Sequence, residues 1–225
     1  MSNVATQPAP FEPTRPSDIA AARAPTDRVF LGFSTTDVFL SAMIRNATGA
    51  KYSHAWLCHG STLWGGAWIT QADYPTVHSW TFEKAIVGWS QLMVYEVSPE
   101  FYDDVRKAML TSRRDFEEKF DIRGLLFMGV VTFVKKWTHK RIGNWLAHPN
   151  QLFCSEFVED VLKATGEHPF ASWQPNESAP KQVYEACEKE RRRFTKISAV
   201  ELATWLEAVG VDMTKVPGTL LASSL

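Results

Sequence analysis

The sequence predicts an α+β domain in which one helix and a small antiparallel sheet are followed by further helices. Three observations lead to this fold class. Short apolar runs typical of strands are concentrated between residues 28 and 98. Glycines and polar residues separate these runs, as in hairpin-type connections. From Pro99 onward, apolar residues recur at the spacing of one helix face.

The first half of the chain supplies the predicted sheet. Regular structure is expected to begin at residues 28–34, an apolar run suited to a buried strand. An amphipathic helix is predicted over residues 36–49, because Gly49 stands where a glycine commonly ends a helix. Three further strand-like segments then follow, at residues 52–59, 64–72 and 91–98.

Helices dominate the second half. Ser98 as a cap and Pro99 at the first helical position predict a helix over residues 98–120. Residues 150–166 show the apolar stripe of another helix. A final helix should begin at the capping box that Ser198 and Glu201 form, and should end near residue 210.

Composition divides the chain into three parts. Residues 1–27 contain five prolines and little apolar periodicity, so we expect a disordered tail. Residues 28–190 form the predicted domain, and residues 191–225 form a C-terminal helix and tail that is packed on it or appended to it. A net charge of −1 gives no field that would attract nucleic acid. With no apolar leader visible and only three cysteines, we expect a cytoplasmic, reducing place of synthesis.

Cys154 lies in the first turn of the predicted helix over residues 150–166, at the edge of its apolar stripe. A helix start offers unpaired N–H groups and the positive end of the helix dipole, both of which stabilise a thiolate. A free cysteine is nevertheless more often a simple packing residue. Chemistry at Cys154 therefore requires a base opposite it.

His54 is the most informative candidate for that base. In an alternating strand, His54, Trp56 and Cys58 would share one face. A histidine within an apolar strand needs partners for its ring nitrogens. Taken alone, the position of His54 favours a core histidine whose hydrogen bonds are satisfied.

Two segments resemble the motifs of circularly permuted papain-like amidases of the NlpC/P60 superfamily, and in particular the YiiX/YaeF-like cysteine hydrolases. The first is the approach to a strand, at Thr48, Gly49, Tyr52, Ser53 and His54, and the second is the helix start at residues 153–158. Residues 177–187 resemble the proline-led helix that closes the fold in that family. The resemblance covers about residues 28–187 and implies a permuted papain-like fold with the nucleophile at a helix N-terminus.

The resemblance also implies a division of roles. Cys154 would be the nucleophile, His54 would be its base, and Gln71 would be the third residue that orients the ring. The family often has an acidic residue at that third place, so Gln71 is a departure, and Asp73 or His78 remain alternatives. Oxyanion donors would be the backbone N–H of Cys154 and, from its place two residues before the histidine, the hydroxyl of Tyr52.

We therefore expect a bacterial or phage cysteine peptidase or amidase that cleaves a peptidoglycan-type peptide or a small γ-glutamyl-like amide through an acyl-enzyme. The nine tryptophans and the apolar residues 124–134 keep a lipid-directed acyltransferase or thioesterase open as an alternative. A non-catalytic binding or structural module is the second alternative.

The expected partners are a peptide, a cell-wall fragment or an acyl substrate, without cofactor, metal or nucleic acid. The basic residues 135–141 could rest on a membrane or wall surface. Because no export signal is visible, action on the cell wall would need delivery by a phage particle, by lysis or by a secretion system. Oligomeric state and biological setting stay open.

Overall fold

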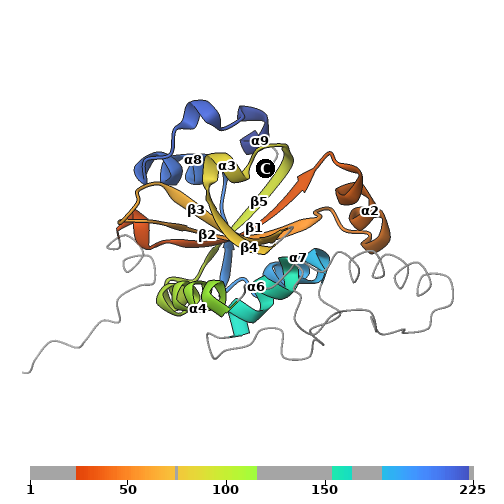
Figure 1. Ribbon diagram of the computed structural model, residues 1–225, viewed down its shortest axis with the longest axis horizontal. Coiled ribbons are helices and arrows are strands. Elements are labelled where there is room, and N and C mark those ends of the chain that lie inside the picture. The colour runs from red at the N-terminus through yellow and green to blue at the C-terminus, as the bar shows by residue number, and fades with distance from the viewer. Residues whose placement is uncertain (1–23, 74–75, 116–153, 164–178, 223–225) are drawn as a thin grey trace, which may run out of the picture.

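A six-stranded antiparallel sheet forms the centre of the molecule, with helices on both of its faces (Figure 1). The computed structural model describes residues 24–73, 76–115, 154–163 and 179–222. The strand order is β4-β3-β2-β1-β5-β6, and neighbouring strands are antiparallel throughout. The strands are β1 (Val29–Thr36), β2 (His54–Gly60), β3 (Ala67–Asp73), β4 (Thr76–Thr81), β5 (Trp89–Val97) and β6 (Phe194–Lys196). The predicted α+β class and antiparallel sheet are confirmed.

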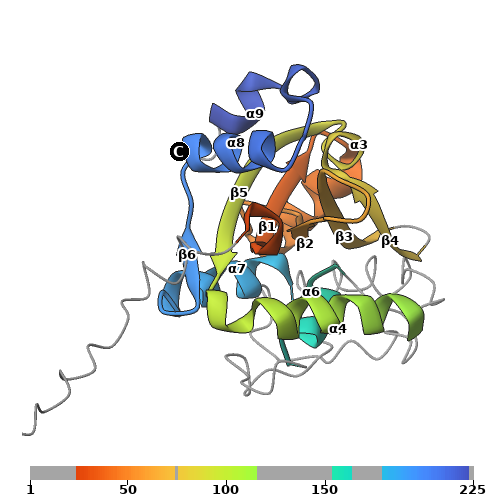
Figure 2. The ribbon, with the colours of Figure 1, turned by 90° about the vertical axis from the view of Figure 1, so that its left-hand side faces the viewer.

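The helices divide between the two faces of the sheet. On one face lie α3, α8 and α9, and on the other lie α4, α6 and α7 (Figures 1 and 2). The α-helices are α2 (Phe39–Thr48), α3 (Phe82–Ala85), α4 (Tyr102–Asp115), α6 (Cys154–Lys163), α7 (Pro180–Lys189), α8 (Ala199–Ala208) and α9 (Gly218–Ala222). Short 3-10 helices are η1 (Pro25–Asp27), η2 (Pro99–Phe101) and η4 (Met213–Lys215).

Strand alternation builds a separate core on each face. Leu31 and Leu57 belong to the α6-side core, which also contains the buried apolar residues of α6. Phe30 and Trp56 belong to the α8-side core, which contains the buried residues of α8. The sheet is therefore covered on both faces, and its central strands are almost fully buried.

Gly32 is required by the α8-side core. It pairs with Trp56 across β1 and β2, and a Cβ atom at Gly32 would lie 2.1 Å from the indole carbon Cη2 of Trp56. We expect Gly32→Ala to lower the free energy of unfolding by about 1–3 kcal/mol, because the indole must leave its position. Urea unfolding measures the loss. Gly218→Ala is the matched control, since its Cβ would meet no atom within 4 Å, and equal losses in the two variants would contradict this packing.

Several predicted elements are confirmed with shifted boundaries. Ser198 and Glu201 form the capping box at the start of α8, where the Glu201 backbone N–H donates to Ser198 Oγ at 3.2 Å. Gly49 ends α2 with a left-handed φ of 63°. The helix predicted from Pro99 begins instead with the 3-10 turn η2, and the Ser98 side chain makes no capping hydrogen bond.

The two ends of the described chain take part in the fold more closely than the sequence predicted. The prediction that the disordered tail extends to residue 27 was wrong, because residues 25–27 form η1. Trp205 Nε1–H donates to the Pro25 carbonyl at 2.7 Å, and Arg106 donates to the Thr26 carbonyl at 2.6 Å. The earlier part of that tail lies outside the described residues. At the other end, β6 pairs with β5, so residues 194–196 are part of the sheet.

Within the described ranges, no helix has the length and apolar character needed to cross a bilayer. The apolar residues 124–134 and the basic residues 135–141, on which the predicted surface contact depends, lie outside the described residues.

Candidate active site

Cys154 is the first residue of α6, the helix that lies beneath β2 and β3 and between α4 and α7 (Figure 1). The apolar stripe of α6 is buried as predicted: Phe157 is fully enclosed against the sheet. The polar side of α6 is buried as well: Ser155 and Glu159 are each 1% exposed, and Glu156 is 5% exposed. The reason is position: α6 contacts helices as well as the sheet, so both of its sides are covered.

His54 and Gln71 approach each other where β2 and β3 separate. The pairing of these strands runs from Leu57↔Thr70 to Gly60↔Ala67, so both site residues lie beyond its end. There, Nε2 of His54 lies 2.9 Å from Oε1 of Gln71. The amide is 2% exposed, so water hardly competes for this hydrogen bond.

The second partner of His54 is Cys154. Burial has the largest single effect and lowers the pKa of His54, whereas the electrostatic interaction and the hydrogen bond with the Cys154 side chain raise it. The charge of Asp73 and the hydrogen bond to Gln71 act in the same direction, and the pKa of His54 rises from 6.5 to about 9. At neutral pH the ring is therefore an imidazolium that lies beside the sulfur.

The structure brings His54 to a partner that strand alternation alone did not indicate. Trp56 and Cys58 pack in the α8-side core, whereas Cys154 belongs to α6 on the opposite face. His54 is the first residue of β2, where the ladder to β3 has not yet begun. On its other side, His54 still pairs with Ser34 of β1.

Of the three candidates for the third residue, Gln71 forms a hydrogen bond with His54. Asp73 influences the ring through its charge, and His78 contacts Gln71, with Nε2 of the ring 3.3 Å from Nε2 of the amide. The strand β4, at the edge of the sheet, carries His78 and was not predicted from the sequence. Thr76 and Val77 favour a strand, but β4 has only six residues and four of them are polar, so the pattern is weak.

Tyr52, the predicted second oxyanion donor, lies in the α6-side core and is 2% exposed. Its ring lies 6.0 Å from that of Phe33 and 5.5 Å from that of Tyr184, centroid to centroid. Burial raises the pKa of Tyr52 against the opposing effect of Lys51, so its hydroxyl keeps the proton that an oxyanion donor needs.

The structure describes two other cysteines, and both are buried more deeply than Cys154, which is 7% exposed. Cys58 and Cys187 are 1% and 0% exposed, and burial raises the pKa of each thiol far above its ordinary value. Both are therefore held as neutral thiols at physiological pH. Neither is a competitive nucleophile.

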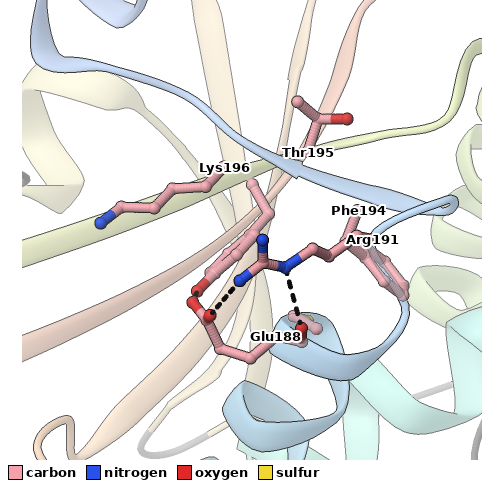
Figure 3. A pocket seen from close by; sticks show the side chains of 7 residues that line it. Glu188, Arg191, Phe194, Thr195 and Lys196 are labelled. Atoms are coloured by element: carbon pink, nitrogen blue, oxygen red, sulfur yellow. Dashed lines mark hydrogen bonds and ion pairs between the residues drawn. The ribbon is translucent and has the colours of Figure 1, made fainter.

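A cavity of about 310 Å³ lies between the end of α7 and β6 (Figure 3). Its lining consists of Tyr95, Cys187, Glu188, Arg191, Phe194, Thr195 and Lys196. Glu188 already accepts a hydrogen bond from Tyr95 and lies 4.0 Å from the guanidinium of Arg191. Since its cysteine is the buried, neutral Cys187, this cavity offers no activated nucleophile.

Among the residues described, no three His, Cys, Asp or Glu side chains gather as a metal site requires. A scan against models of protein families finds no match, and a search of the curated proteins finds none either. The case for a function therefore depends on the contacts among Cys154, His54 and Gln71.

Proposed function

We propose that this protein is a cysteine hydrolase that cleaves an amide bond through an acyl-enzyme on Cys154. One observation carries the proposal: the His54 ring contacts both the Cys154 sulfur and the amide of Gln71. A thiol, a base and a group that orients the base are the components of a nucleophilic triad. The motif resemblance supports the same roles, and it supports a permuted papain-like fold of the NlpC/P60 type, with the histidine preceding the cysteine.

Acylation follows from the charge state of this pair. The Cys154 thiolate attacks the carbonyl carbon, and the carbonyl oxygen becomes an oxyanion. The backbone N–H of Cys154, at the start of α6, and the hydroxyl of Tyr52 are the proposed donors to that oxygen. As the C–N bond breaks, the leaving nitrogen takes a proton from the His54 imidazolium. An amine departs, and a thioester and a neutral His54 remain.

Deacylation uses the same groups in the reverse direction. Neutral His54 takes a proton from water while the water oxygen attacks the thioester carbonyl. The C–S bond breaks, a carboxylic acid is released, and the thiolate–imidazolium pair is restored. Gln71 keeps the His54 ring in one orientation through both steps, and the charge of Asp73 supplies the electrostatic support that a neutral amide lacks.

The substrate class we propose is a peptidoglycan-type peptide or a small γ-glutamyl-like amide. This choice rests on the resemblance. The chemistry itself requires a carbonyl compound whose leaving group accepts the proton of His54, which describes an amide better than it describes a thioester.

Labelling of the native protein tests whether Cys154 is the activated thiol. We expect iodoacetamide at neutral pH to modify Cys154 at least about tenfold faster than Cys58 or Cys187, because a thiolate reacts and a buried neutral thiol does not. Peptide mass spectrometry locates the label, and the urea-unfolded protein, in which all three thiols are accessible, is the control. A native Cys154 that stays unmodified would overturn the proposal.

The acyl-enzyme then identifies the bond. The intact protein is mixed with a wall-type peptide amide or with a long-chain acyl thioester, and its mass is followed with and without hydroxylamine. Turnover of the amide, with an acyl group on Cys154, supports the hydrolase. If only the thioester is turned over, the protein is an acyltransferase or thioesterase and the proposed amide hydrolase is wrong.

A further inference from the structure

His78 lies directly opposite Gln71 in the β3–β4 ladder. Its Nδ1 is 3.1 Å from the backbone carbonyl of Thr76, and its Nε2 is 3.3 Å from Nε2 of the Gln71 amide. Two independent contacts therefore hold the two ring nitrogens of this histidine. Neither contact involves the reacting atoms.

The chemistry of these atoms allows one arrangement of protons. A backbone carbonyl can only accept, so Nδ1 of His78 must carry the ring proton. A neutral imidazole has a single N–H, so Nε2 of His78 must accept, and the group facing it must be the NH2 of Gln71. The amide oxygen of Gln71 then faces His54, whose Nε2 must donate to it. Nδ1 of His54 remains for the sulfur of Cys154.

We propose that His78 is a positioning residue that fixes the orientation of the Gln71 amide and, through it, the orientation and tautomer of His54. The inference deepens the proposed hydrolase and rests on it for its catalytic consequence. Without His78, the Gln71 amide could turn its NH2 toward His54. Two donors would then face each other, and the hydrogen bond that orients the base would be lost.

The surroundings of His78 keep it in the state that this role requires. Burial is the main effect that lowers the pKa of His78, so the ring stays neutral and its Nε2 stays an acceptor. The charged groups that face it are Asp73 from β3, which raises its pKa, and His54 from β2 and Lys84 from α3, which lower it.

The ring of Trp80 covers His78, with 4.2 Å between the ring centroids, and Lys84 Nζ lies 4.7 Å from the centre of the Trp80 ring. Trp80 therefore packs against the His78 ring, which is partly buried although it lies on an edge strand.

Two variants of the full chain separate positioning from packing. His78→Phe keeps a ring against Trp80 but has no acceptor for the Gln71 amide, whereas His78→Gln restores a non-titrating acceptor. The readout is the rate at which iodoacetamide modifies Cys154, measured at about pH 6 and about pH 10. We expect His78→Phe to react roughly tenfold more slowly at the lower pH, because a misoriented His54 no longer holds the thiolate.

At the higher pH the thiol ionises without help, so the two variants and the native protein should react at similar rates. A packing defect would change the rate at both pH values. Equal rates for His78→Phe and the native protein at about pH 6 would overturn the proposal, as would a failure of His78→Gln to recover most of the loss.

Imidazole ¹⁵N spectra of the native protein test the arrangement without any substrate. We expect a neutral His78 with its proton on Nδ1, and a proton on Nε2 of His78 would overturn the proposal. If the spectra show a neutral His78 with its proton on Nδ1 but no amide is cleaved, the proposed hydrolase function is wrong and the positioning role of His78 stands. If Cys154 forms an acyl-enzyme but His78→Phe reacts like the native protein, the positioning role fails and the hydrolase stands.

Discussion

Cys154→Ala is expected to lower the rate of amide hydrolysis by about 10⁴-fold or more, because the variant has no atom that can form the acyl intermediate. Initial rates on a wall-type peptide, at equal concentrations of folded protein, measure the effect. Cys154→Ser should be almost equally inactive, since the hydroxyl of serine does not ionise beside His54 as a thiol does.

The other buried cysteines supply the matched controls for this loss. Cys58→Ala and Cys187→Ala each remove a thiol from a core position, as Cys154→Ala does, and each should keep activity within about threefold of the native value. An active Cys154→Ala variant would contradict the assignment of the nucleophile. Equal losses in all three variants would show that the activity reports only on core packing.

His54→Gln is expected to have the second largest effect, a loss of about 10³- to 10⁴-fold in kcat. Glutamine approximates the size and polarity of the ring but can neither take the thiol proton nor return it to the leaving group. His59→Gln is the control, because His59 lies on the same strand and its Nδ1 bonds only to the Gly60 carbonyl among the contacts described. Comparable losses in both variants would remove His54 from the mechanism.

The pH dependence of the native enzyme follows from the same residue. The pKa of His54 is raised to about 9, so the ring carries its proton at neutral pH and loses it as the pH rises through about 9. Acylation needs that proton, so kcat/KM for an amide should fall on the alkaline side with an apparent pKa near this value.

The free energy of unfolding should also fall as the pH rises. A raised pKa means that the interactions of the protonated His54 ring stabilise the fold fully below the unfolded pKa of about 6.5, and that this contribution disappears as the pH rises through about 9.

The sequence patterns predicted those parts of the fold that depend on local regularity. The apolar run of β1 and the capping box of α8 are examples, because each is determined by neighbouring residues. The strands β4 and β6 were not predicted, since one is a short, half-polar edge strand and the other has three residues. Their formation depends on the strands beside them, which no local pattern records.

In the candidate site, too, local sequence patterns predicted some features, while others depend on neighbouring elements. Helical periodicity places Cys154 in the first turn of α6, the first motif suggests His54, and the family resemblance suggests Gln71 as the third residue. Periodicity could not show that His54 and Gln71 lie beyond the end of the β2–β3 pairing, or that His54 contacts a helix that alternation assigns to the other face. Nor could it show that Ser155 and Glu156 are buried, because that depends on helices packed beside α6.

The most direct test of the account is a titration of the His54 ring by NMR in the native protein and in Cys154→Ala. We predict that His54 in the native protein titrates near pH 9, and that its pKa falls in the variant, where the sulfur no longer opposes the effect of burial. A His54 that titrates at the same pH in both proteins would show that the ring and the sulfur do not interact, and would contradict the proposed mechanism.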